Sequence, residues 1–247
     1  MPVEAPDIIE MDTAKITEVD LKYLDFDTSS LSDKQGKVWK DLKELGKRYI
    51  NKYDKVGEKD DLAVVTGRFQ PPHLGHLYQI LAALEVADHV AIVLGSSNSF
   101  INNPAENPDV NRERAIRQDV DNPFPAKQRE ILLKHFLKKI GKERGESLLD
   151  RVSFVPSDDV WNDKKWGDNT IRDVGMLGKG RIDVVVANDG WVSNIFQKRS
   201  MRVLPVPFLL KPNGDRYEAT QERIGLRTPE GNRPAVLAAK GQHIVRV

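Results

Sequence analysis

The stretch from Gly67 to His76, which reads GRFQPPHLGH, constrains the fold of this chain more than any other segment. It follows an apolar run, Leu62 to Val65, that is typical of a buried β-strand. Beyond it, the i, i+3, i+4, i+7 spacing of an amphipathic helix is met by Leu77, Ile80, Leu81 and Leu84. The segment is therefore predicted to join the carboxyl end of a strand to a helix, where open α/β sheets bind phosphorylated ligands.

The residue types in this turn suit a phosphate group. Imidazolium N–H groups from His73 and His76, the Arg68 guanidinium and the free amides of a helix N-terminus can all point at a phosphate that gathers negative charge. Gly75 lets the backbone approach a ligand closely. A structural reading also stays open, in which the two histidines only cap the helix and Gly75 only makes a turn.

From residue 62 onward, short apolar segments rich in β-branched residues alternate with segments of helical pattern. The predicted strands are Leu62–Thr66, His89–Leu94, Arg151–Val155, Ile182–Ala187 and Arg202–Val206. The predicted helices are about Gly75–Ala87, Ala126–Ile140, Lys164–Leu177 and Val192–Lys198. This order predicts an α/β fold, a Rossmann-like doubly wound parallel sheet of about five strands.

Residues 1–60 form an N-terminal extension outside this pattern. Residues 1 to about 30 are acidic and aperiodic, and we expect loop there. An amphipathic helix is predicted over about Asp33–Tyr53, opened by a capping box of Ser32 and Gln35. One helix cannot bury its apolar stripe alone, so we expect it to dock on the core or on another subunit of a homo-oligomer.

The expected α/β domain spans residues 61–227. Within it, residues 95–122 are polar and lack periodicity, and such a long connection is usually functional or disordered. We expect this stretch to be an inserted flap beside the phosphate site. Residues 228–247 form a C-terminal tail.

Composition narrows the class of protein. The 38 basic and 37 acidic residues leave a net charge of +1, which gives no general field for nucleic acid or an anionic membrane. The chain has no cysteine, which excludes disulfides, thiolate zinc sites and a cysteine nucleophile. The start lacks a signal-peptide pattern, and no apolar run approaches the roughly 20 residues that span a bilayer. We expect a cytoplasmic protein that binds neither nucleic acid nor membrane.

The decapeptide resembles the signature of a known family. Gly67–His76 is similar to the motif of the HxGH nucleotidyltransferases, in the GRFQPxHxGH form of the archaeal and bacterial nicotinamide-nucleotide adenylyltransferases. The resemblance covers about residues 62–227 and includes three further segments in the same order and spacing.

These segments carry departures from the family pattern. Asn122–Arg129, which reads NPFPAKQR, is similar to the family's NPFTAGER stretch, with Lys127 and Gln128 in place of Gly-Glu. Arg216–Arg223, which reads RYEATQER, resembles its late YSGTEVR element, with Glu218 in place of the usual serine.

The resemblance implies adenylyl transfer from ATP to nicotinamide mononucleotide, which yields NAD and pyrophosphate. The mononucleotide's 5′-phosphate would attack the α-phosphorus in line, so no nucleophile on the protein is required. The resemblance assigns catalysis to His73, His76 and Arg223, and the ATP site to Gly67, Arg68, Phe69, Gly75, Arg129 and Thr220. Mg²⁺ is expected to be carried with ATP, because it rarely takes an all-protein cage.

The remaining segment resembles the family's nicotinamide mononucleotide site, where the family has an Asp, an Asn and a Trp at the positions of Asp159, Asp163 and Trp166. An aromatic face beside carboxylates suits a cationic pyridinium. Trp166 could also be an ordinary core residue, and Trp161 is a competing candidate. Asn188 and Asp189 follow a predicted strand, so they either line the same crevice or form a helix N-cap.

Two alternatives stay open. The chain could be a nucleotidyltransferase for another phosphorylated acceptor, which the departures at Asp163 and Glu218 allow. It could instead be a nucleotide-binding regulatory or structural protein with lost turnover, an idea motivated by the N-terminal extension and by Glu218. Retention of both histidines and of Arg223 argues against lost turnover.

Overall fold

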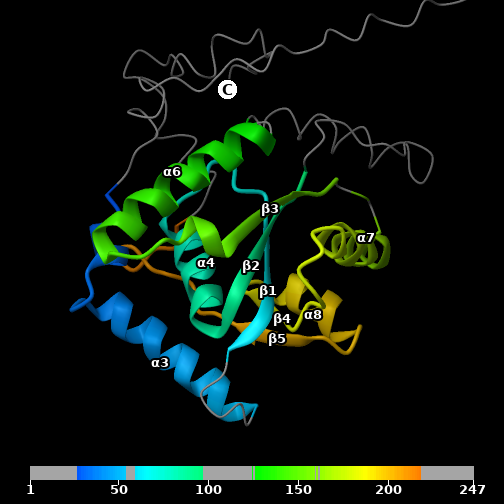
Figure 1. Cartoon of the computed structure of the whole chain (residues 1–247), viewed down its shortest axis with the longest axis horizontal. Helices are drawn as coiled ribbons and strands as arrows, with labels where there is room; N and C mark the ends of the chain where they lie inside the picture. The colour runs from blue at the N-terminus through cyan, green and yellow to red at the C-terminus, as the bar shows by residue number, and fades with distance from the viewer. Residues whose placement is uncertain are drawn as a thin grey trace, which may run out of the picture.

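The computed structural model describes residues 27–53, 59–96, 124, 126–158, 160 and 162–217 of the chain. They contain one five-stranded sheet made of β1 (Asp60–Gly67), β2 (Ala87–Leu94), β3 (Val152–Pro156), β4 (Val184–Ala187) and β5 (Arg202–Pro205). The spatial order is β3-β2-β1-β4-β5, and all four pairings are parallel (Figure 1). The predicted doubly wound parallel sheet is confirmed.

The central strand, β1, is paired on both of its edges. Ala63 lies opposite Val90 of β2 on one side and Val184 of β4 on the other. Along β1, Leu62 and Val64 belong to one apolar cluster, whereas Ala63 and Val65 belong to another. Both faces of the strand are therefore covered, which explains why its sequence is an unbroken apolar run.

Helices cover both faces of the sheet (Figure 1). The face that carries Ala63 and Val65 is packed by α3 (Lys37–Lys52), α4 (Leu74–Val86) and α6 (Ala126–Arg144). The opposite face is packed by α7 (Asp163–Gly175) and α8 (Gly190–Gln197). The chain leaves β1 and β4 for opposite faces, so the topological switch point lies between these two strands.

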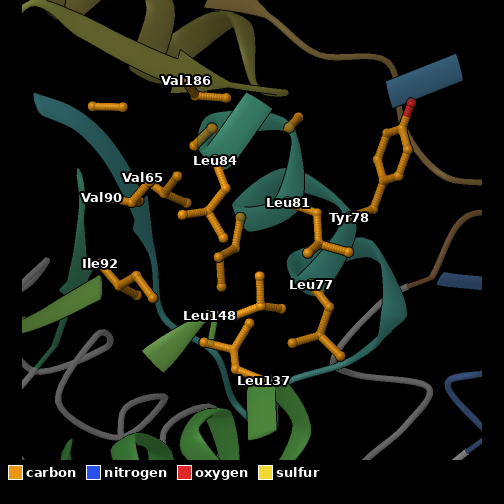
Figure 2. Close-up of a cluster of buried hydrophobic side chains, with 14 of the residues drawn as sticks. Val65, Leu77, Tyr78, Leu81, Leu84, Val90, Ile92, Leu137, Leu148 and Val186 are labelled. Carbon is orange, nitrogen blue, oxygen red and sulfur yellow. The ribbon is translucent and has the colours of Figure 1, made fainter. Parts of the chain in front are cut away.

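The helix α4 is buried on almost all sides. The prediction that it would be amphipathic, with one exposed face, is wrong. Besides the expected leucine stripe, its buried residues include Tyr78, Gln79, Ala82 and Ala83. The helix lies between the sheet and the helices α3 and α6, so almost every side is covered. Figure 2 shows Leu84 beside Val65 and Val90 of the sheet, with Leu137 and Leu148 close to Leu77. Its position is therefore fixed from several directions at once.

The predicted start of the N-terminal helix is also wrong. Ser32 ends a separate short helix, α2 (Ser29–Ser32), and its hydroxyl donates back to the Thr28 and Ser29 carbonyls. A turn follows, in which the Gly36 N–H donates to the Asp33 carbonyl, and α3 begins only at Lys37. The expected capping box does not form, because Ser32 bonds to preceding carbonyls rather than to following amides.

Several predicted segments lie outside the described residues. These are most of the expected flap of residues 95–122, the tail of residues 228–247, and the first 26 residues of the extension. The domain boundaries assigned there stay predictions. In the part of the chain that is described, no helix is both long and apolar enough to cross a membrane.

A buried polar network ties α3 to the amino ends of the strands. Asp60, the first residue of β1, is 1% exposed. Its carboxylate accepts hydrogen bonds from the Tyr49 hydroxyl at 2.6 Å and from the Arg202 guanidinium at 2.8 Å. Burial and the neighbouring carboxylate raise the pKa of the Tyr49 hydroxyl. The extension therefore docks on the core of its own chain, through polar as well as apolar contacts.

We expect Tyr49→Phe to lower the free energy of unfolding by about 1–3 kcal/mol, because the buried Asp60 carboxylate loses one of its donors. Urea unfolding at neutral pH measures this loss. Tyr53→Phe is the matched control, since it removes a hydroxyl from the neighbouring ring while leaving the Asp60 bonds in place. Equal losses in the two variants would contradict this role for the Tyr49 hydroxyl.

Candidate active site

The turn that follows β1 is organised around the Phe69 side chain. Phe69 has a φ of 53° and its ring is 1% exposed. A Cβ atom added at Gly67 would lie 3.0 Å from this ring, so glycine allows the ring to fold back over the end of β1. On its other side the ring lies 4.8 Å from that of His76, measured between centroids. Phe69 thus supports the second histidine of the motif.

The two histidines of the motif are stacked against each other at the start of α4. His73 immediately precedes the helix, and the ring centroids of His73 and His76 are 3.7 Å apart with an interplanar angle of 25°. The His73 backbone N–H donates to His76 Nδ1 at 3.3 Å. Because Nδ1 accepts, the proton of neutral His76 lies on Nε2. His76 therefore offers a single N–H donor with a fixed tautomer.

Both rings are neutral in the free protein at neutral pH. Desolvation by burial, helped by the charge of Lys211, lowers the pKa of His73 to about 4. Desolvation by burial is the main cause that lowers the pKa of His76 well below its ordinary value, and the charge of protonated His73 is a smaller cause. The imidazolium form was expected opposite a phosphate, and for the liganded site it stays a prediction. A phosphate beside the rings would favour protonation and raise these pKa values.

Gly75 makes the stacking of the histidines sterically feasible. A Cβ atom at this position would lie 3.1 Å from His73 Cε1 and 3.2 Å from His73 Nδ1. It would also lie 3.5 Å from the Cβ atom of Tyr217. The close approach that Gly75 permits in this structure is therefore to His73 and Tyr217.

Arg129 holds together the carboxyl ends of β1 and β2. Its side chain is fully buried on α6, and Nη1 donates to the carbonyls of Arg68 and Gly95, both at 2.6 Å. Nη2 donates to the Ser96 carbonyl at 2.9 Å. The described contacts of this guanidinium are thus with the backbone of the site itself, and its predicted phosphate contact stays a prediction. Arg68, by contrast, has an exposed side chain at the end of β1.

Gln70 is a buried polar residue of the motif that the sequence analysis did not single out. Its side-chain amide donates to the Phe124 carbonyl and accepts from the Phe124 N–H, both at 2.9 Å. This paired contact fixes the turn to the chain that leads into α6. A glutamine inside a glycine- and proline-rich turn was the available signal, because a polar side chain buried there needs a backbone partner.

The predicted nicotinamide-stacking residue, Trp166, lies in the core. It is 7% exposed and packs against Phe196, at 5.9 Å between ring centroids, and against Trp191, at 5.1 Å. Trp191 is 48% exposed, and its Nε1 donates to the Asp163 carboxylate at 3.1 Å. Sequence reasoning missed Trp191, although its place directly after Asn188-Asp189-Gly190 at the end of a strand was a usable signal.

Asp189 and Asn188 stand at the switch point of the sheet. Asp189 is the N-cap of α8, where its carboxylate accepts from the Trp191 backbone N–H at 2.6 Å. Val65 pairs with Val186, and continuing this register places Gly67 beside Asn188. The histidine turn and the segment that leads to Trp191 therefore begin at the carboxyl ends of adjacent strands.

A pocket of about 560 Å³ lies between β3 and α7. Its lining includes Phe154, Asp158, Asn169 and Arg172, and neither histidine borders it. The histidine turn is therefore not part of this pocket. Within the described part of the chain, no cluster of three His, Cys, Asp or Glu side chains could hold a metal ion.

Some predicted site residues fall outside the described parts of the chain. These are Asp159, Thr220 and Arg223, together with Trp161 and Glu218, which were weighed beside them. Their roles stay predictions.

The lowered pKa of His73 predicts a loss of stability in acid. An unfolded histidine takes up a proton near pH 6.5, whereas the folded His73 does so only near pH 4. The contribution of the neutral ring is therefore complete above pH 6.5 and is lost as the pH falls towards 4, by roughly 3 kcal/mol in all. His73→Asn should flatten the fall in unfolding free energy between about pH 7 and pH 5, measured by urea unfolding. Parallel curves for the two proteins would contradict this pKa.

Comparison with known proteins agrees with this geometry. Residues 64–218 match the family described as cytidylyltransferase-like. A nicotinamide-nucleotide adenylyltransferase of Saccharolobus solfataricus is 28% identical over 158 residues, which cover 64% of this chain and 74% of that protein. A nicotinamide/nicotinic acid mononucleotide adenylyltransferase of Acinetobacter baylyi is 32% identical over 126 residues, which cover 51% of this chain and 54% of that protein.

Among solved structures, a bifunctional NMN adenylyltransferase/ADP ribose pyrophosphatase from Francisella tularensis superposes with a TM-score of 0.51 at 24% identity. The match covers 71% of this chain and 44% of that one, so this chain spans less than half of the bifunctional protein. At this identity the likeness shows the fold alone. The family match covers more than half of the chain and includes the histidine turn, the switch point and α7. The chain therefore belongs to the cytidylyltransferase-like family of nucleotidyltransferases.

Proposed function

We propose that this protein transfers the adenylyl group of ATP to nicotinamide mononucleotide, forming NAD and pyrophosphate. The observation that carries the proposal is the stacked pair of His73 and His76 at the N-terminus of α4, beside the switch point of the sheet. The names of the relatives from Saccharolobus solfataricus and Acinetobacter baylyi support the choice of acceptor.

The reaction needs no covalent intermediate on the protein. An oxygen of the mononucleotide's 5′-phosphate forms a bond to the α-phosphorus of ATP, and the bond from that phosphorus to the oxygen bridging to the β-phosphate breaks. The electron pair leaves with pyrophosphate. The protein contributes by positioning the two substrates and by stabilising the charge that builds on the α-phosphate. Magnesium enters with the substrate as Mg·ATP.

The tautomer of His76 suits it to this task. Nδ1 is occupied by the His73 backbone N–H, so Nε2–H is available to donate to a phosphate oxygen. The N-terminus of α4 carries partial positive charge at the same place. Arg68, exposed at the end of β1, supports the predicted phosphate contact. Thr220 and Arg223 keep their predicted roles at the triphosphate.

Trp191 supports recognition of the nicotinamide ring. Its exposed indole lies against buried Trp166, so the outer ring is rigidly backed. The carboxylates of Asp163 and Asp189 bond to its side chain and its backbone. An aromatic face beside negative charge attracts a cationic pyridinium. Trp166 then serves the site through Trp191, while Asp159 and Asn188 keep their predicted places around the mononucleotide.

A coupled assay for NAD tests the proposal directly. The protein is incubated with Mg·ATP and either nicotinamide mononucleotide, its deamidated form or phosphopantetheine, and pyrophosphate release is measured in parallel. The proposal expects turnover with a pyridine mononucleotide and much less with phosphopantetheine. Preference for phosphopantetheine would assign the enzyme to another acceptor. Tight ATP binding without any turnover would favour a regulatory protein.

His76→Ala should lower kcat by about 10²–10³-fold, because a donor to charge that develops in the transition state is lost. His89→Ala is the matched control. His89 lies near the amino end of β2, where its ring contacts the Ser153 hydroxyl. The control should keep near-normal turnover, measured by NAD formation. Near-normal turnover in His76→Ala would remove His76 from the catalytic machinery.

Trp191→Ala and Trp166→Ala should separate the two tryptophans. Trp191→Ala should raise KM for the mononucleotide about tenfold with little change in KM for ATP, because an exposed stacking surface is lost. Trp166→Ala should instead lower the free energy of unfolding by about 3–5 kcal/mol, since it empties a core position. Steady-state kinetics and urea unfolding measure the two effects. A mononucleotide KM unchanged in Trp191→Ala would contradict the stacking role.

A further inference from the structure

The helices α7 and α8 approach each other most closely at Gly167 of α7. A Cβ atom added at this position would lie 2.8 Å from Ile195 Cγ2 on α8 and 2.6 Å from Arg199 Cζ. Real Cβ atoms do not come this close to a neighbour, so a larger side chain would have to displace one of the two residues. The glycine therefore permits a close and specific contact between the two helices.

Arg199 joins the two helices at this contact. It lies in the turn that closes α8, where its backbone N–H donates to the Phe196 carbonyl at 3.0 Å. Its Nε donates to the Asp168 carboxylate at 3.0 Å, and its Nη2 donates to the Lys164 carbonyl, both on α7. Its Nη1 donates to the Ile195 carbonyl of α8 at 2.5 Å. One guanidinium thus binds acceptors on both helices.

The shape and burial of this guanidinium make the link rigid. The Arg199 side chain is only 16% exposed, whereas Lys164, the other partner of Asp168, has an exposed side chain and belongs to the same helix as Asp168. A guanidinium holds its donors in a planar fork, so three acceptors bound at once define both the distance and the angle between the elements that carry them. Arg199 therefore constrains the packing of α7 on α8 more than an exposed ion pair would.

The contacts of Trp191 are made across the same pair of helices. Trp191 lies at the start of α8, and its indole bonds to Asp163 at 3.1 Å and packs on Trp166 at 5.1 Å between ring centroids. Both partners belong to the first turn of α7, and Lys164, whose carbonyl Arg199 binds, lies between them in the sequence. A shift of this turn would change both contacts of the indole. The orientation of the exposed ring therefore depends on Arg199, although Arg199 lies beyond the opposite end of α8.

We propose that Arg199 is a positioning residue for the nicotinamide mononucleotide. By fixing the first turn of α7 against α8, it holds the Trp191 indole in the orientation that accepts the pyridinium ring. The identity of that ring rests on the proposed function, whereas the effect of Arg199 on the indole does not. A small displacement of a stacking surface reduces its overlap with the ligand. Loss of Arg199 should therefore weaken binding of the mononucleotide and leave ATP binding unchanged.

Calorimetric titration of nicotinamide mononucleotide measures this effect without turnover. Arg199→Met keeps the aliphatic stem and should weaken binding of the mononucleotide about fivefold, while Mg·ATP binds within about twofold of the wild type. In the steady state, the change should appear in KM for the mononucleotide and not in kcat. Arg172→Met is the matched control, because the ion pair of Arg172 is with Asp173, inside α7. This control should bind both ligands as the wild type does.

A double-mutant cycle separates positioning from a general loss of structure. In a Trp191→Ala background, Arg199→Met should change the affinity for the mononucleotide by less than about twofold, because the surface through which Arg199 acts is already gone. An equal loss in both backgrounds would show that Arg199 acts elsewhere and would overturn the proposal. So would an equal loss of affinity for Mg·ATP.

The Trp191 indole N–H gives a readout that needs no ligand. Its signal in a proton–nitrogen NMR spectrum is identified by its loss in Trp191→Ala. Arg199→Met should shift this signal and speed its hydrogen exchange, while the indole signal of Trp39, on α3, stays unchanged. Arg199→Gln replaces the Met variant if thermal melting shows that the latter does not fold.

The NMR and binding results together separate the two proposals. Either an unchanged Trp191 signal or wild-type affinity for the mononucleotide in Arg199→Met overturns the role of Arg199. A shifted Trp191 signal in a protein that neither binds the mononucleotide nor forms NAD refutes the proposed function, and with it the ligand, but leaves Arg199 as the residue that positions the indole.

Discussion

The burial of α4 between the sheet and two other helices is the constraint on which the site depends. Its apolar residues contact the sheet on one side and the helices α3 and α6 on the other. A helix held from several directions cannot shift without opening cavities in a close-packed core. Its N-terminus is therefore fixed relative to the ends of β1 and β4. This also fixes the two histidines, because His73 immediately precedes the helix and His76 lies on its first turn.

Desolvation sets the chemical state of this site. The same packing that fixes the histidines removes water from them and holds their pKa values low. The unliganded site thus presents neutral donors, and an arriving polyphosphate supplies the charge that can shift them. Arg129 is also removed from water. Its buried charge is compensated by carbonyl oxygens from the ends of two strands, so it also holds those strand ends in place.

The order of elements and their bounds to within a few residues were predictable from sequence, because the strands are short apolar runs rich in β-branched residues and the helices carry a helical spacing of apolar residues. The predictions that depended on which other residues a side chain contacts were less accurate. The start of α3 was missed because Ser32 and Gln35 match a capping box equally well in a turn. The amphipathic reading of α4 failed because residues such as Ala82 and Tyr78 carry no polar signal that distinguishes a surface from a second apolar interface.

The sequence by itself determined the strand, turn and helix around Gly67–His76, the parallel sheet, and the family to which they belong. These follow from spacing and residue type, which are local properties of the chain. Only the tertiary structure decided that the histidines are neutral, that Trp191 rather than Trp166 presents an exposed ring, and that Lys211 lies beside His73. Burial and electrostatic interaction depend on residues distant in sequence, so these properties were fixed only when α7 packed on α8 and the chain after β5 returned to the start of α4.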